Sequence, residues 1–382
     1  MQPITSAKES EIINDRIIWK RQADTGPVLV IFAGIHGNEL AGVLACDHVI
    51  PKLESGEYPF EGSVYMLTGN KKAIENGARF LDRDLNRIWN EFDDLGELKK
   101  KEGAEFDEAE ELLETIRSII RAEEADGRQI FFVDLHTTSA QSCAFIPFND
   151  TLANRKIAHK FPVPQILGIE EFIQGTLLSY INDLGYPCIG FEAGAHTDPV
   201  SVERAESFLW LCLHELSIVE LEQEEVKAHQ EVLTTVPDIP DTYYEITYHH
   251  YVEDASRFYM KRGYTNFDRI DKEELLAYED GERIHAPFSG LIFMPLYQAK
   301  GNDGFFIIKP RSPFWLQLSE VLRDSFLNNI LAYLPGVRMN EEGNFEVNLK
   351  IARFLVKEIF HLLGYRVIRK QPYLIEAYKR DR

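Results

Sequence analysis

A histidine and a glutamate stand three residues apart in the segment GIHGNE, residues 34–39. The pair, His36 and Glu39, follows the apolar run Val28 to Phe32, which favours a short buried strand. The flanking glycines allow a tight backbone turn that would aim both side chains in one direction. A neutral imidazole and a carboxylate are suitable ligands for a divalent metal ion. The same spacing also occurs by chance on helix surfaces, so on its own it leaves that alternative open.

A second histidine, His136, directly follows the apolar run Ile130 to Leu135. This run reads IFFVDL and predicts a central strand. Open α/β sheets place their ligands at the carboxyl ends of strands, so this position suits a metal ligand. Asp134 lies two residues earlier and points to the same face, where it could accept the other imidazole N–H. A histidine satisfied by hydrogen bonds at a strand end is the structural alternative.

Glu192 occupies the segment GFEAGAH, at the end of a further apolar strand candidate, Pro187 to Phe191. A carboxylate there is either a solvated loop residue or a group in a partly dry cleft with a raised pKa. The second case suits a general base that takes a proton from an attacking water.

Hydrogen-bond donors are concentrated in RFLDRDLNR, residues 79–87, although the chain as a whole is acidic. Guanidinium and amide groups of this kind can hold a carboxylate and polarise a carbonyl oxygen. The alternative is a set of surface ion pairs with Asp82 and Asp84, which is the interpretation we favour for Arg83. The donors are Arg79, Arg83, Asn86 and Arg87.

The elements that must position these residues alternate between strand and helix over residues 1–225, the predicted first domain. Besides the strands above, Val64 to Leu67 is a buried-strand candidate. Apolar residues at helical spacing over 106–120 predict an amphipathic helix, and Asp198-Pro199 is a typical start for another. Alternation of this kind predicts an α/β fold with a mixed central sheet flanked by helices.

The pattern changes beyond this region. Strand-like segments broken by Gly and Pro predict a smaller β-rich domain over residues 240–312, which we expect to cover the cleft. Residues 313–382 are predicted to be an α-helical extension, with helices over about 315–333 and 347–363 before a short strand at 365–368. This extension could pack on the β-rich domain or form an interface in a homo-oligomer.

The composition limits the classes of partner. The chain has 382 residues, 45% of them hydrophobic and 12% aromatic, which predicts two domains with sizeable cores. A formal net charge of −21 disfavours nucleic acid and anionic membrane surfaces as partners. No signal peptide and no apolar stretch long enough to span a bilayer are evident. Four scattered cysteines without a CxxC pair suggest a reducing compartment, so we expect a cytoplasmic protein.

Four motifs, in this order, resemble the succinylglutamate desuccinylase/aspartoacylase family, which groups with the zinc carboxypeptidases. The resemblance covers residues 25–220 well and continues more weakly to about residue 310. It implies a zinc carboxypeptidase-like catalytic domain followed by a β-rich domain. The motifs are GIHGNE, RFLDRDLNR, DLHTTS and GFEAG.

The same resemblance implies a role for each site residue. Two histidines and one glutamate would hold one Zn²⁺ per chain and leave a position open for water, as expected of a catalytic zinc. The implied reaction is hydrolysis of an amide to a carboxylate and an amine. The matched metal ligands are His36, Glu39 and His136; Glu192 matches the general base, Arg79 the carbonyl-polarising arginine, and Asn86 and Arg87 the pair that grips the substrate carboxylate.

The sequence departs from the family at Asn182. Aspartoacylases carry an arginine about ten residues before the catalytic glutamate, at the position of Asn182. That arginine binds the acidic side chain of their substrate. Residues 170–191 contain no Lys or Arg. We therefore expect the substrate to be another N-acyl amino acid or a related small amide, and not N-acetylaspartate.

Two other functions fit the same residues. A carboxypeptidase acting on peptides or cell-wall fragments would need a more open cleft than a deacylase of small molecules. A metal-binding or sensory protein without catalysis would not need Glu192 and Arg79, and their presence speaks against that class.

Overall fold

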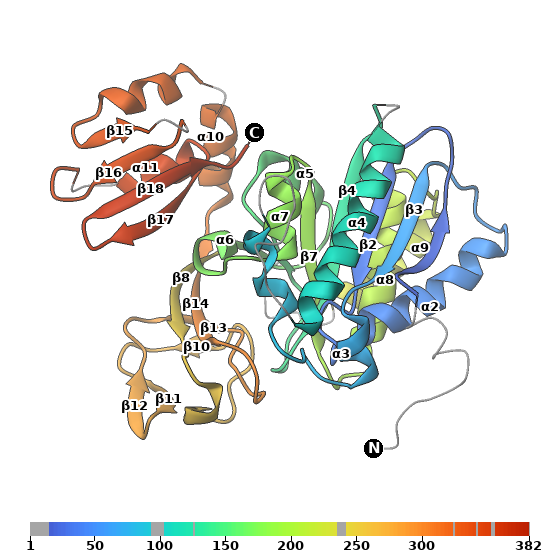
Figure 1. The fold of residues 1–382 in the computed structure, drawn as a ribbon, viewed down its shortest axis with the longest axis horizontal. Coiled ribbons are helices and arrows are strands. Elements are labelled where there is room, and N and C mark those ends of the chain that lie inside the picture. Colours follow the sequence, from blue (N-terminus) through green and yellow to red (C-terminus); the bar gives the residue numbers. More distant parts are fainter. Residues whose placement is uncertain are drawn as a thin grey trace.

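The computed structural model describes residues 15–92, 103–124, 127–234, 242–323, 325–340, 343–352 and 356–381. Its centre is a five-stranded sheet with the order β1-β3-β2-β4-β7 (Figure 1). Four neighbouring strands run parallel, and β1 pairs with β3 in the antiparallel direction. The bounds are β1 Ile17–Arg21, β2 Val28–Ala33, β3 Ser63–Thr68, β4 Ile130–Thr138 and β7 Cys188–Ala195.

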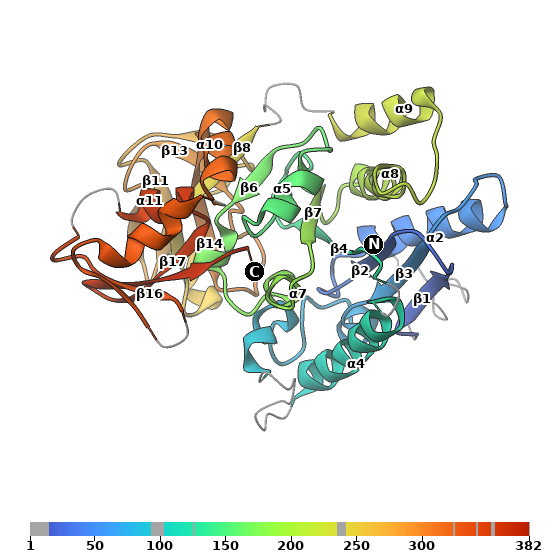
Figure 2. The ribbon, with the colours of Figure 1, turned by 90° about the horizontal axis from the view of Figure 1, so that it is seen from above.

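Helices cover both faces of this sheet (Figure 2). On one face α2 and α8 pack against β2, β4 and β7, and α9 packs on α8. On the other face α4 packs against β4 and α7 packs against β7. These helices are α2 Ala41–Glu54, α4 Ala104–Glu124, α7 Leu177–Asp183, α8 Val200–Glu215 and α9 Gln223–Leu233. Because both faces are covered, β2 is buried at every position, as a continuous apolar run requires. The predicted mixed sheet flanked by helices is confirmed.

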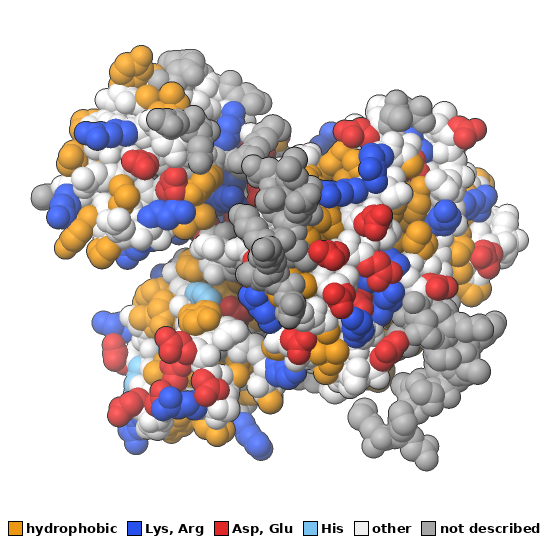
Figure 3. Space-filling view, viewed as in Figure 1, with side chains coloured by type: hydrophobic (Ala, Val, Ile, Leu, Met, Phe, Trp, Pro, Cys, Tyr) orange, Lys and Arg blue, Asp and Glu red, His pale blue; other side chains and the backbone are white. Residues whose placement is uncertain are grey.

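The described residues of α4 show the polar outer face expected of such a helix. Figure 3 shows acidic and basic side chains interspersed over it, while Phe106, Leu113 and Ile116 are buried beneath. Among the helices in the described ranges, none is long and apolar enough to cross a membrane.

A second sheet joins the first 225 residues to the β-rich segment, residues 242–312. Its order is β10-β13-β14-β8-β6-β5, and β6 pairs with β8 in parallel. A hydrogen-bonded sheet therefore continues across the predicted domain boundary. Its strands are β5 Ile146–Pro147, β6 Gln165–Leu167, β8 Tyr243–Tyr251, β10 Arg269–Ile270, β13 Gly290–Phe293 and β14 Asp303–Arg311. A three-stranded sheet lies beyond it, with β9 Phe258–Met260, β11 Leu275–Glu279 and β12 Glu282–His285.

The C-terminal unit, described over residues 313–381, is not the α-helical extension that the sequence predicted. It holds a four-stranded antiparallel sheet of order β15-β16-β18-β17 beside its helices (Figure 1). Buried Phe345 and Val347 alternate with exposed Glu346 and Asn348, a period of two that belongs to a strand. The helices α10 Pro313–Arg323, η4 Phe326–Tyr333 and α11 Val356–Leu362 are shorter than predicted, and the strands are β15 Val337–Met339, β16 Phe345–Asn348, β17 Tyr365–Gln371 and β18 Leu374–Lys379.

The remaining short helices connect these layers. They are α3 Lys71–Glu75, η1 Leu85–Arg87, η2 Trp89–Glu91, α5 Leu152–Ala158, α6 Ile169–Phe172 and η3 Ala255–Arg257.

Candidate active site

The carboxyl ends of three parallel strands bring the predicted site residues to one edge of the central sheet. His136 of β4 lies directly opposite Glu192 of β7 in the strand register. β2 pairs with the other side of β4, so the loop after β2 emerges beside them. That loop carries His36 and Glu39. The parallel register alone therefore explains why the three motifs meet.

The loop after β2 makes an unusually close approach to α3. A side chain at Gly37 would lie 2.1 Å from the backbone carbon of Ala73, so only glycine fits there. The amide of Gly37 donates to the carbonyl oxygen of Arg79 at 3.1 Å. These contacts fix the turn that presents His36 and Glu39 to the cavity.

His36, Glu39 and His136 form a buried cluster whose ligand atoms all lie within 4.8 Å of one another. Nδ1 of His36 lies 2.8 Å from Oε1 of Glu39, and Nδ1 of His136 lies 3.0 Å from Oε2. Burial disfavours the charged form of Glu39, but the two histidines outweigh it and hold the pKa of Glu39 well below its usual value. The carboxylate is therefore ionised and ready to bind a cation.

A carboxylate stands behind each imidazole. Nε2 of His136 lies 2.8 Å from Oδ2 of Asp134, the contact predicted from their spacing on β4. Nε2 of His36 lies 3.1 Å from Oδ1 of Asp84, which the sequence interpretation had left among surface ion pairs. Acids in these positions set the tautomer and orientation of ligating histidines. Asp84 is a residue that sequence reasoning missed, because nothing near it in the chain indicates a contact with His36.

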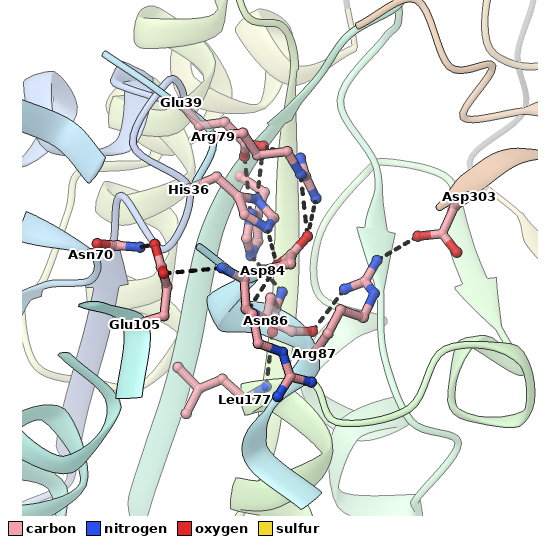
Figure 4. A network of polar contacts seen from close by, with 12 residues as sticks. His36, Glu39, Asn70, Arg79, Asp84, Asn86, Arg87, Glu105, Leu177 and Asp303 are labelled. Carbon is pink, nitrogen blue, oxygen red and sulfur yellow. Dashed lines mark hydrogen bonds and ion pairs between the residues drawn. The ribbon is translucent and has the colours of Figure 1, made fainter. Parts of the chain in front are cut away.

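Arg79 reaches the same cluster from the loop after α3 (Figure 4). Nη1 donates to Oε1 of Glu39 at 3.1 Å, and Nη2 donates to Oδ2 of Asp84 at 3.1 Å. Burial would raise the pKa of Asp84, but His36 and the nearby arginines lower it well below its usual value. Arg79 is thus held in place by two ionised acids. By contrast, Arg83 makes a surface ion pair, as favoured for it, but its partner is Glu91 in place of the predicted Asp82 or Asp84.

Asn86 and Arg87 lie on η1, whose first turn is capped by the Asp84 side chain. The side-chain oxygen of Asn86 accepts a hydrogen bond from the amide of Leu177 at 2.9 Å, and its nitrogen lies 3.4 Å from Nε2 of His136. Arg87 lines the cavity and donates to Asp303 of the β-rich segment. The structure therefore brings both residues to the site predicted for them.

Glu192 is buried at this edge, and its Oε2 atom has no hydrogen-bond partner among the described residues. Burial raises the pKa of Glu192 to about 8, while His136 and Arg79 act in the opposite direction. Positive charge at the neighbouring cluster would lower this pKa again. Of the two alternatives for Glu192, the carboxylate in a partly dry cleft therefore applies, and the solvated loop residue does not.

The loop of residues 79–87 is held by another acid that sequence reasoning missed. Glu105, on the first turn of α4, accepts hydrogen bonds from the amides of Leu81, Asp82 and Arg83. It is fully buried. The sequence did contain a signal for the burial of Glu105. Positions 105, 112 and 119 fall on one buried stripe of α4, and an acid on such a stripe needs a hydrogen-bond or ion-pair partner.

His196, just beyond β7, contributes a further contact. Its Nδ1 lies 2.7 Å from the hydroxyl of Thr137, whose amide donates to Oε2 of Glu39 at 2.9 Å. Thr137 therefore contacts both His196, through its hydroxyl, and Glu39, through its amide.

The cavity over the cluster is about 80 Å³, and one part of its lining is apolar. The side chain of Asn182, where aspartoacylases have an arginine, makes its hydrogen bonds with other residues. Its oxygen accepts a hydrogen bond from Asn154, and its nitrogen donates one to the carbonyl oxygen of Tyr186. Among the described residues, Arg79 and Arg87 are the Lys or Arg side chains that line the cavity. The apolar wall consists of Pro147, Ile169, Ile173, Leu178 and Met294.

A family model described as the succinylglutamate desuccinylase/aspartoacylase catalytic domain matches residues 25–217. The chain belongs to this family. The resemblance predicted from the four motifs is confirmed, and all four lie within the matched range.

Curated relatives in the family are succinylglutamate desuccinylases. That of Pseudomonas paraeruginosa is 43% identical over 67 residues, which are 18% of this chain and 20% of the relative. That of Shewanella pealeana is 25% identical over 262 residues, 62% of this chain and 71% of the relative. The Pseudomonas fluorescens SBW25 enzyme is 35% identical over 114 residues, 30% of this chain and 32% of the relative. The chain thus spans a third or less of the length of the two Pseudomonas relatives.

Solved structures of the family share the fold. A succinylglutamate desuccinylase/aspartoacylase from Rhodobacter sphaeroides has a TM-score of 0.57 at 16% identity, over 77% of this chain and 88% of that chain. The ectoine utilization protein EutE from Ruegeria pomeroyi, in a product-bound structure, has a TM-score of 0.54 at 15% identity, over 76% and 87%. At these identities the likeness concerns architecture alone.

Proposed function

We propose that this protein is a zinc-dependent deacylase that hydrolyses the amide bond of an N-acyl amino acid or a related small amide. The observation that carries the proposal is the meeting of the ligand cluster with Glu192 at one edge of the central sheet. The small cavity with an apolar wall favours a small amide over a peptide chain.

The donor set fits a zinc ion. His36, Glu39 and His136 are the two histidines and one glutamate of a typical catalytic site, and each imidazole has a carboxylate at its far nitrogen. One oxygen each of Asp134 and Glu192 is buried without a hydrogen-bond partner in the described structure, and a nearby cation would stabilise this negative charge. Zinc bound there would supply a Lewis acid that makes water nucleophilic near neutral pH.

The chain's own residues would perform the proton transfer and the charge stabilisation. Glu192 lines the cavity, and its Oε2 has no hydrogen-bond partner among the described residues, so it can take the proton of an attacking water and then return it to the departing nitrogen. Arg79, fixed by Glu39 and Asp84, offers a cation to the carbonyl oxygen as it becomes negative. The apolar wall would exclude other water from the reacting amide.

Removal and return of zinc test the proposed function directly. We expect the chelated protein to lose hydrolysis of a panel of N-acyl amino acids and N-acyl amines, and about one equivalent of zinc to restore it. Zinc should also raise the melting temperature, because it binds the folded cluster and not the unfolded chain. The substitution His36→Ala should abolish both responses.

The matched control is His48→Ala, since His48 is half-exposed and pairs with Glu206 on the surface. It should bind zinc and turn over substrate like the wild type. Faster hydrolysis of dipeptides than of every N-acyl compound would support the carboxypeptidase class instead. A zinc-loaded protein without any turnover would support the non-catalytic class.

The substitution Arg79→Lys tests the proposed polarising role. Lysine keeps the charge but loses the fork that bonds Glu39 and Asp84, so we expect kcat to fall by about 100-fold with little change in zinc content. Steady-state kinetics and metal analysis measure the two effects. Arg83→Lys in the same loop is the control, and its kcat should stay at the wild-type value because Arg83 faces solvent and Glu91. Equal kcat values for both variants would remove Arg79 from the mechanism.

A further inference from the structure

Asp303 of the β-rich segment forms an ion pair with Arg87, the arginine expected to bind the substrate carboxylate. Nη2 of Arg87 donates to Oδ2 of Asp303 at 2.5 Å (Figure 4). The other oxygen of Asp303 lies 2.9 Å from Nε2 of His249 on β8. Asp303 is the first residue of β14, where it pairs with Tyr251 of β8. The sheet of the β-rich segment therefore holds this carboxylate against the site.

The ion pair is largely removed from solvent, with 28% of the Arg87 side chain and 20% of the Asp303 side chain exposed. Burial would raise the pKa of Asp303, but Arg87 and His249 lower it below its usual range. Burial would lower the pKa of Arg87, and Asp303 and Asp84 raise it. Both groups are therefore charged, and their charges offset each other inside the site.

No other cation of the described site is available for a substrate carboxylate. Two adjoining cavities, of about 80 and 50 Å³, share Arg79 and Arg87 in their linings. Arg79 is bound to Glu39 and Asp84. The smaller cavity adds neutral or apolar residues and Asp303 itself. With a net charge of −21, the chain as a whole also repels an anionic ligand.

A carboxylate on the substrate's amine half would meet these groups at a cost. If the substrate carboxylate shared Arg87 with Asp303, two negative charges would lie at one partly buried guanidinium. If it displaced Asp303, that acid would keep only His249 as a partner. A neutral or apolar substituent would meet neither penalty.

We propose that Asp303 is a specificity-determining residue that selects amides whose amine half carries no carboxylate beside the nitrogen. This inference rests on the proposed deacylase function and narrows it, from N-acyl amino acids in general to N-acyl amines. The protein's own carboxylate fills the place that a substrate carboxylate would take.

The test uses one matched pair of compounds, N-acetyl-leucine and N-acetyl-3-methylbutylamine, which differ only by the carboxylate. The zinc-loaded wild type should hydrolyse and bind the amine derivative at least about 10-fold better than the acid. In Asp303→Asn, kcat/KM and affinity for N-acetyl-leucine should rise by about 10- to 100-fold, because Arg87 becomes free for a charge-assisted hydrogen bond. Calorimetric titration of the same proteins with the added substitution Glu192→Gln, which slows turnover, supplies the affinities.

Two further variants keep the result interpretable. Asp280→Asn makes the same charge change at an exposed turn of the same segment, and it should leave the preference unchanged. Asp303→Glu keeps the carboxylate and should retain the wild-type preference if the charge is what matters. Melting curves of all variants report whether the β-rich segment stays folded.

The outcomes separate the two proposals. Tighter binding of N-acetyl-leucine than of the amine derivative by the wild type would overturn the role of Asp303 and leave the deacylase proposal standing. An unchanged preference in a folded Asp303→Asn variant would overturn it as well. Hydrolysis of neither compound, nor of any other N-acyl compound, by zinc-loaded protein would instead overturn the deacylase proposal, while the titration would still decide whether Asp303 excludes the carboxylate.

Discussion

Replacing Glu192 with glutamine is expected to lower kcat by about 1,000-fold while the zinc content stays at the wild-type level. Glutamine keeps the shape of the side chain but cannot take a proton from water. Glu192 lies opposite His136 in the strand register, yet it is outside the cluster of proposed ligands, so the metal should remain bound. Steady-state kinetics and metal analysis of the purified variant measure both quantities.

The matched control for this prediction is Glu203→Gln, which removes an exposed carboxylate on the first turn of α8, shortly after the same strand. Its kcat should equal that of the wild type. The melting temperature of Glu192→Gln should not fall, because burial already disfavours the charge that the substitution removes. A zinc-loaded Glu192→Gln variant with wild-type kcat would rule out Glu192 as the general base.

Replacing Arg380 with alanine is expected to destabilise the protein by about 3–5 kcal/mol. Arg380 lies near the end of the C-terminal unit, and its guanidinium bonds three acids of the first domain: Asp150 at 3.1 Å, Glu170 at 2.8 Å and Glu171 at 2.9 Å. Glu170 is buried, and Arg380 is the sole ion-pair partner found for it in the described structure. Without Arg380 that acid would be left buried and uncompensated.

Denaturant unfolding at neutral pH measures this loss, with Arg369→Ala as the control because Arg369 is exposed on β17. The control should change the free energy of unfolding by less than about 0.5 kcal/mol. An equally small effect of Arg380→Ala would show that the network does not hold the C-terminal unit in place.

The same network sets the pH dependence of stability. Burial raises the pKa values of Asp150 and Glu171, but the surrounding arginines and His361 lower them below their unfolded values. Acids with depressed pKa values stabilise the fold above their unfolded pKa, about 4, and this contribution is lost as the pH falls below it. Arg380→Ala removes part of the depression, so its stability should fall less steeply below that pH than that of the wild type.

This network also links the C-terminal unit to the candidate site. Glu170 and Glu171 belong to α6, and its first residue, Ile169, and the residue after it, Ile173, form part of the cavity wall. The contact of Arg380 with Glu170, 210 positions earlier in the chain, therefore helps to position the apolar wall of the cavity.

The edge of the central sheet that carries the candidate site could be predicted from the amino-acid sequence. His36, His136 and Glu192 each follow an apolar run, and the carboxyl ends of parallel strands meet at one edge. The contact of Asp134 with His136 could also be predicted, because a spacing of two on a strand puts both side chains on one face. The order of the motifs identified the family, and the family model confirmed it. The catalytic and metal-binding roles themselves stay predictions.

The acids that stand behind these residues could not be predicted, because long-range packing brings them there. Asp84 faces His36 and not Arg83 because the loop of residues 79–87 folds back over the cluster, held by Glu105. Asp303 meets Arg87 across 216 residues of chain, through a sheet that continues over the expected domain boundary. The C-terminal sheet was missed because its strands are short, and their alternation of buried and exposed residues competes with the signals of nearby helices. Local patterns report which face of an element is buried, whereas the partners that long-range packing brings to that face leave no mark on the neighbouring sequence.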